Sequence, residues 1–134
     1  MDITLQQQSE FKKQMEQLAV FCFRGYQIPE YMREGIAKHV AFGVPNGSFL
    51  TAMLSCNMEV AMNHADDTNM WLLPVYYAYF FNHIPMSAWG TAERVHLWKA
   101  RCLKERENAN KDANKNSSKD SSEHSYNKVA SIQL

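Results

Sequence analysis

The sequence lacks cationic residues over most of its centre: neither Lys nor Arg occurs between Lys38 and Arg94. Over all 134 residues, Lys and Arg together number 14 and balance the 14 Asp and Glu. A general nucleic-acid binder needs a basic surface that displaces the counterions around phosphates. We therefore expect no general nucleic-acid binding. An anion held by the central segment would depend on backbone N–H groups, side-chain amides, aromatic rings or a metal.

Cysteine is also scarce, and so are long apolar runs. Cys22, Cys56 and Cys102 form no CxxC pair, which excludes zinc-knuckle and thioredoxin motifs and favours free, buried thiols in a reducing compartment. The longest apolar run, 70–81, contains Pro74 and is shorter than the ~20 residues of a membrane span. The N-terminus lacks the layout of a signal peptide. We expect a cytoplasmic protein, with no membrane partner and no cofactor.

The pattern that is present is helical. Apolar residues recur three or four positions apart, and no stretch alternates as a strand does. Gly, Pro and capping residues separate these segments, and the length suits one domain. The pattern predicts an all-α fold, a small irregular bundle of short helices. The expected helices run from Thr4 to about Phe23, from Pro29 to Gly43, from Ser48, from Asn57, from Asp66 or Asp67, from Pro74 to Asn82, and from Thr91.

The composition changes abruptly near Lys104. Residues 105–125 contain no large apolar side chain and consist mostly of Glu, Asn, Lys, Asp, Ala and Ser. Such a segment buries too little surface to offset the entropy lost on ordering. The sequence therefore predicts one helical domain over 1–104 and a disordered polar tail over 105–134.

Short motifs follow one another in a set order through residues 29–98. They are Pro-Glu-Tyr-Met at 29–32, Gly-x-Pro-x-Gly-Ser-Phe-Leu at 43–50, Ala-Asp-x-x-Asn at 65–69, Leu-Pro at 73–74, and Pro85 followed by Trp89-Gly90-Thr91. In this order they resemble a family of small temperate-phage and prophage proteins. Asn46, Asn57-Met58-Glu59 and Ser87-Ala88 depart from the family pattern, which has a cysteine where Ala88 stands. The resemblance implies a phage or mobile-element accessory protein and implies no activity.

Two of the expected helices start at glycine-containing loops: the first loop is 43–47, before Ser48, and the second is 89–91. Backbone N–H groups at a helix start bind anions, and Trp89 would be a stacking wall if the two loops lay side by side. The first loop lacks the Lys and the spacing of a P-loop, and any tight connection uses the same residue types. Arg33, Lys38 or Arg94 would have to fold over the pocket to hold a phosphate. The candidate ligand-binding residues are Gly43, Asn46, Gly47, Ser48, Trp89, Gly90 and Thr91.

Four central residues are of metal-ligand type: His64, Asp66, Asp67 and His83. A bound metal would activate water for hydrolysis. Their spacing matches no helix-borne motif such as His-Glu-x-x-His, and helix capping explains both aspartates. No Ser or Cys has the setting of a nucleophile. We therefore expect no metal and no catalytic residue, with a metal-dependent hydrolase as the third interpretation.

Aromatic residues crowd the segment 71–81. A helix buries about half of its circumference, so some of these rings face outward, and tyrosine is typical of protein interfaces. The first hypothesis is a non-enzymatic accessory protein of host takeover or counter-defence that binds a host or phage protein, or itself as a homo-oligomer. The alternative is a small-ligand binder, such as a sponge for a nucleotide signal. The candidate interface residues are Trp71, Tyr76, Tyr77, Tyr79 and Phe80.

Overall fold

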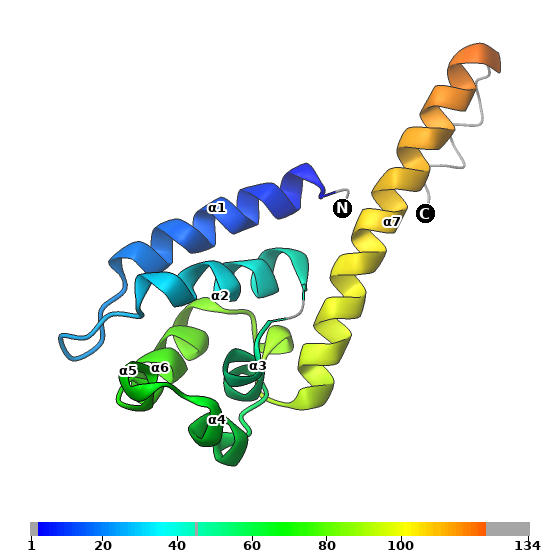
Figure 1. Ribbon diagram of the computed structural model, residues 1–134. Coiled ribbons are helices and arrows are strands. Elements are labelled where there is room, and N and C mark those ends of the chain that lie inside the picture. The colour runs from blue at the N-terminus through cyan, green and yellow to red at the C-terminus, as the bar shows by residue number, and fades with distance from the viewer. Residues whose placement is uncertain (1–2, 45, 123–134) are drawn as a thin grey trace.

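The computed structural model describes residues 3–44 and 46–122, with side chains described as far as residue 113. The helices α1 and α2 lie antiparallel, α3 to α6 pack beneath them, and α7 crosses one end of the body (Figure 1). The predicted all-α fold is confirmed. Among the described helices, none has both the length and the apolarity for a membrane crossing. The elements are α1 (Leu5–Val20), α2 (Glu30–Phe42), α3 (Ser48–Leu54), α4 (Met58–His64), α5 (Asp67–Met70), α6 (Leu73–His83), the 3₁₀ turn η1 (Met86–Ala88) and α7 (Ala92–Ser122).

Side-chain caps set the start of four helices. Thr4, Asn57, Asp66 and Thr91 each accept a hydrogen bond from the backbone N–H three residues ahead. These four starts agree with the sequence prediction. The sequence also favours Ser48 as the cap of the third helix, and this is wrong: α3 begins at Ser48 itself, and Gly47 occupies the cap position without a side chain to bond.

Helix ends follow from backbone geometry and packing. Gly43 ends α2 as predicted, with a left-handed φ of 66° that favours glycine. A Cβ at this position would also lie 2.9 Å from both Lys99 Cα and Cys102 Cβ, so glycine allows α7 to approach. Pro74 lies in the first turn of α6, where its missing N–H leaves no unpaired donor. The helix α1 ends at Val20, three residues before the predicted Phe23.

The core lies between the α1–α2 pair and α6. Tyr76, Tyr79 and Phe80 of α6 are fully buried, and Leu18 and Ile36 meet them from the other layer. The two buried tyrosine hydroxyls are both hydrogen-bonded, which removes the cost of burying them. Further buried members of this core are Ile28, Ala37, Val40, Leu50, Met53, Leu54, Val75, Ala88 and Val95.

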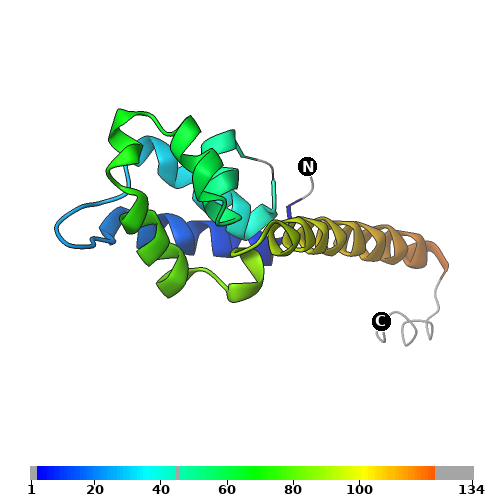
Figure 2. The same ribbon diagram turned by 90° about the horizontal axis from the view of Figure 1, so that it is seen from below.

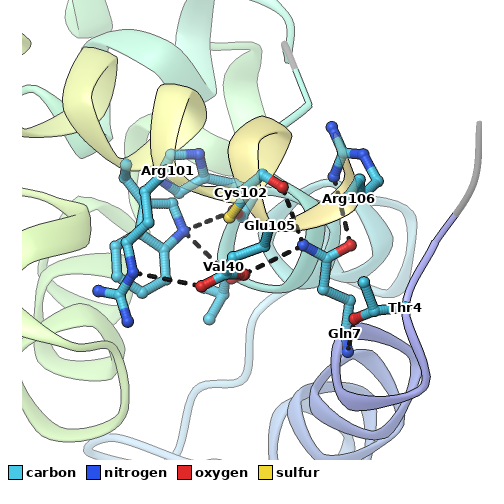
Figure 3. Close-up of polar contacts among 9 residues, drawn as sticks. Thr4, Gln7, Val40, Arg101, Cys102, Glu105 and Arg106 are labelled. Atoms are coloured by element: carbon cyan, nitrogen blue, oxygen red, sulfur yellow. Dashed lines mark hydrogen bonds and ion pairs between the residues drawn. The ribbon is translucent and has the colours of Figure 1, made fainter. Parts of the chain in front are cut away.

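Helix α7 docks on α1 through a buried polar junction (Figure 3). Arg106 Nη1 donates to the carbonyl of Phe42 at 2.7 Å and to Gln7 Oε1 at 3.4 Å. The Gln7 amide donates in turn to the carbonyl of Cys102 at 3.1 Å and to Glu105 Oε1 at 3.2 Å. Arg106 is only 8% exposed. Packing against α1 and α2 therefore continues to Arg106, two residues past the predicted boundary at residue 104.

Beyond Arg106, α7 continues to Ser122 and projects away from the body in both views (Figures 1 and 2). Residues 107–113 are exposed. The helical part of the predicted polar tail is thus continuous with the domain. The remainder, 123–134, lies outside the described residues.

Candidate functional site

The two loops that were expected to share a ligand pocket lie in different places. Asn46, Gly47 and Ser48 line one cavity, and the segment 89–91 is absent from the described lining of that cavity. Gly43 lies outside the lining of this cavity and packs against α7. The structure therefore separates the candidate ligand-binding residues into the set 46–48, the set 89–91 and Gly43 by itself.

Trp89 belongs to the core instead of a ligand pocket. It is 7% exposed, and its ring centroid lies 5.3 Å from that of Tyr77 and 5.7 Å from that of Phe80. The next residue, Gly90, donates its backbone N–H to the carbonyl of Leu54 at 2.7 Å, which ties this loop to the end of α3. Trp89 therefore stabilises the packing of the segment before α7 against α6.

A cavity of about 460 Å³ lies beside the first loop, and we call it the loop cavity. The first turns of α2 form one wall, and the start of α3 forms another. His64 and Asp66 close it from the connection between α4 and α5. The cavity thus brings together three of the seven candidate ligand-binding residues and two of the four candidate metal ligands. Its described lining residues are Tyr31, Met32, Gly35, Asn46, Gly47, Ser48, Phe49, Leu50, His64, Asp66 and Asn69.

A chain of hydrogen bonds fixes the acidic side of the loop cavity. Tyr31 Oη donates to Asp66 Oδ2 at 2.5 Å, and the backbone N–H of Asn69 donates to Asp66 Oδ1 at 2.7 Å. The Asn69 amide donates to Tyr31 Oη at 3.5 Å, and the Tyr76 hydroxyl donates to Asn69 Oδ1. Asn69 and Tyr76 are buried. The carboxylate of Asp66 is therefore held by contacts that reach into the core.

The same contacts shift the pKa values of the groups involved. The hydrogen bond to Asp66 raises the pKa of Tyr31, and that bond, followed by the one from the Asn69 backbone, lowers the pKa of Asp66. Burial raises the pKa of Tyr76. At neutral pH the loop cavity thus contains an ionised carboxylate beside the neutral phenol of Tyr31.

The candidate metal ligands are not gathered at one point. His64 and Asp66 line the loop cavity, whereas the ring of His83 packs against Phe21 and Tyr79 at the far end of α6. Asp67 lies in α5 and is absent from the described lining of the loop cavity. Within residues 3–44 and 46–122, no three His, Cys, Asp or Glu side chains form a metal-binding group.

The three cysteines are free, and they differ in exposure. Cys22 and Cys56 are exposed, contrary to the prediction that the thiols are buried, whereas Cys102 is buried. Burial raises the pKa of the Cys102 thiol to about 11. It also raises that of Cys56. Neither has the lowered pKa of an activated nucleophile.

A second hollow lies on the outer face of α6, and we call it the apolar groove. It has a volume of about 650 Å³, and none of its described lining residues carries a formal charge. Phe81 is 71% exposed and Tyr77 is 48% exposed, and their rings stack at a centroid distance of 6.5 Å. The lining residues are Phe23, Met58, Leu73, Pro74, Tyr77, Ala78, Phe81 and Asn82.

The structure divides the candidate interface residues. Trp71 is 82% exposed and Tyr77 faces the apolar groove, whereas Tyr76, Tyr79 and Phe80 are fully buried and belong to the core. The sequence contained the signal for this division, because positions 76, 79 and 80 share one helix face and positions 77 and 81 share another. Phe81 was missed, although its position four residues after Tyr77 places both rings on the same face. Phe23 and Met58 reach the groove from other segments and gave no local signal.

Comparisons of the chain with protein-family models, with curated proteins and with solved structures find no match. The functional argument therefore rests on the loop cavity and the apolar groove themselves.

Proposed function

We propose that the protein acts by protein–protein binding and that the apolar groove is its contact surface. The observation that supports this is an uncharged hollow with two large aromatic side chains exposed on one helix face. Contiguous exposed apolar surface is unfavourable in water, and on soluble proteins it commonly marks an interaction site. The proposal assigns no catalytic role to any residue.

The groove restricts the chemistry of the partner. Phe81 and Tyr77 together expose roughly 240 Å² of side-chain surface. Covering this area and an equal area of the partner gains about 12 kcal/mol before the cost of association. That cost is of similar size, so the partner must also fill the rest of the groove. Since no described lining residue is charged, a helix with an apolar stripe is the complement that fits.

The resemblance of residues 29–98 to a temperate-phage family supports a partner from the host cell or the phage. Under this proposal the protein is an accessory factor of host takeover or counter-defence. A second copy of the chain is the other partner with the required apolar surface. The two differ in a measurable way, because only the second changes the mass of the purified protein alone.

Native mass spectrometry of the protein isolated from its host tests the proposal. We expect a second polypeptide or a second copy to be retained, and Phe81→Glu to release it by placing a charge in the groove. Leu97→Glu is the matched control, because Leu97 is 56% exposed and lies on α7, away from the groove. A wild-type protein that carries no other chain would contradict the proposal. So would a Phe81→Glu variant that retains its partner.

Small-ligand binding is the second candidate function, because the loop cavity has the size of a ligand site. A nucleotide signal is not the ligand that this cavity favours, since Asp66 is ionised and the described lining contains no Lys or Arg. The metal-dependent hydrolase has the least support, because His64 and Asp66 line the loop cavity whereas His83 packs against Phe21 and Tyr79.

A further inference from the structure

The loop cavity carries charge of one sign. Asp66 is the one carboxylate among its described lining residues, and no Lys or Arg is among them. The three cations that were candidates to cover it are all engaged elsewhere. Arg33 Nε donates to the carbonyl of Ile28 at 2.9 Å, Lys38 pairs with Glu34 at 2.8 Å, and Arg94 Nη1 donates to the carbonyl of Trp89 at 3.4 Å.

The carboxylate of Asp66 has unused capacity to accept hydrogen bonds. A carboxylate offers about four acceptor positions. Tyr31 and the backbone of Asn69 each occupy one position, on different oxygens of Asp66, and the backbone of Thr68 also acts on this carboxylate. These two bonds also hold the side chain in place, because Asn69 is itself bonded to buried Tyr76. A cationic donor in the cavity would therefore meet a carboxylate that is already oriented.

The other walls of the loop cavity are apolar or aromatic. Met32, Phe49 and Leu50 also line it, and Tyr31 is 62% exposed. An aromatic face attracts a cation through its quadrupole. The approach of α2 to α3 is close, since a Cβ on Gly35 would lie 3.2 Å from a Leu50 methyl carbon. These walls suit a ligand with an apolar body attached to its charged group.

We propose that the loop cavity is a binding site for a small organic cation. An ammonium or amidinium group donates to Asp66, and the apolar body of the ligand packs against Met32 and Phe49. Tyr31, Asn69 and Tyr76 position the carboxylate. This site is independent of protein binding at the apolar groove, because the two hollows share no described lining residue.

Isothermal titration calorimetry with three probes of one shape tests the charge preference. The probes are benzamidine, which is cationic, benzamide, which is neutral, and benzoate, which is anionic. We expect benzamidine to bind at least about tenfold more tightly than benzamide, because hydrogen bonds to a charged group are the strong ones. Benzoate is expected not to bind. Equal binding of benzoate, or no binding of benzamidine at millimolar concentration, would overturn the proposal.

Two substitutions locate the site. Asp66→Asn keeps a good helix cap and nearly the same shape, so the fold is retained while benzamidine affinity falls by about tenfold or more. Asp67→Asn is the control, because Asp67 is exposed, as Asp66 is, but is absent from the described lining of the loop cavity. Thermal melting of both variants verifies folding. If the two variants bind benzamidine equally well, the cation does not bind at Asp66 and the proposal fails. Phe81→Glu should leave benzamidine binding unchanged.

Discussion

The two faces of α6 have nearly the same composition and opposite surroundings. Tyr76, Tyr79 and Phe80 are fully buried, whereas Tyr77 and Phe81 are half to mostly exposed. The two faces differ in the residues from other parts of the chain that contact them. The hydroxyls of Tyr76 and Tyr79 meet Asn69 and Gln14, which are themselves buried, whereas the groove around Tyr77 and Phe81 has an apolar lining. Aromatic content alone therefore does not identify an interface.

Gln14 supplies the hydrogen-bond acceptor for a tyrosine on the buried face of α6. Its carboxamide oxygen accepts the Tyr79 hydroxyl at 2.7 Å, and its N–H₂ group donates to Glu10 Oε2 at 3.0 Å and to the carbonyl of His83 at 3.3 Å. A buried hydroxyl without an acceptor is costly. The inner tyrosines are thus tolerated because α1 and α5 supply acceptors.

Truncating one ring on each face should give the largest contrast. We expect Phe80→Ala to lower the free energy of unfolding by about 3–5 kcal/mol, because it leaves a cavity in the core. Phe81→Ala should change it by less than about 0.5 kcal/mol, since most of that ring is already in water. Urea denaturation followed by circular dichroism measures both. Equal losses would show that the outer ring is also part of the core.

Removing one hydroxyl on each face should give a smaller contrast of the same sign. Tyr79→Phe leaves the buried carboxamide oxygen of Gln14 without a donor, and we expect a loss of about 1–3 kcal/mol. Tyr77→Phe is the matched control and should stay within about 0.5 kcal/mol. A neutral Tyr79→Phe would mean that water or another donor replaces the hydroxyl.

The buried imidazole of His39 should make the stability of the protein depend on pH. His39 is fully buried and Nε2 donates to the carbonyl of Ala88 at 2.8 Å, while no partner of Nδ1 is found in the described part of the chain. Burial lowers the pKa of His39, so below about pH 6.5 the unfolded chain takes up a proton that the folded chain refuses. Stability should therefore fall with decreasing pH, by at most about 1.4 kcal/mol per pH unit.

Urea midpoints between pH 7 and pH 5.5 measure this effect. His39→Gln should flatten the pH dependence, whereas His96→Gln, a change at an exposed position of α7, should leave it unaltered. A wild-type midpoint that stays constant over this range would contradict the assignment of His39 as a neutral interior group.

Local chemistry explains which features could be predicted. The caps at Thr4, Asn57, Asp66 and Thr91 each depend on residues within one helical turn, so the helix starts followed from the sequence. The loop cavity did not, because its central contact joins Tyr31 to a carboxylate 35 positions away. Its acidic character became visible only when residues from separate helices were placed together.

The buried end of the domain shows the same limit more strongly. Arg106 stands in a polar run, and composition alone places such a residue in solvent. Its acceptors are the carbonyl at the end of α2 and Gln7, which lies 99 positions earlier. The last carbonyl groups of a helix have no N–H partner within that helix, so they need a donor from elsewhere. The sequence does not reveal which distant side chain supplies that donor.

The first half of α7 is anchored to the body and its end projects into solvent, so this end stays accessible while a partner occupies the apolar groove. From Arg106 to Ser122 the helix extends roughly 24 Å at its usual rise per residue. It points away from α6 in both views (Figures 1 and 2). A partner seated in the apolar groove therefore leaves this helix accessible, and a label placed on residues 107–113 would not obstruct the partner.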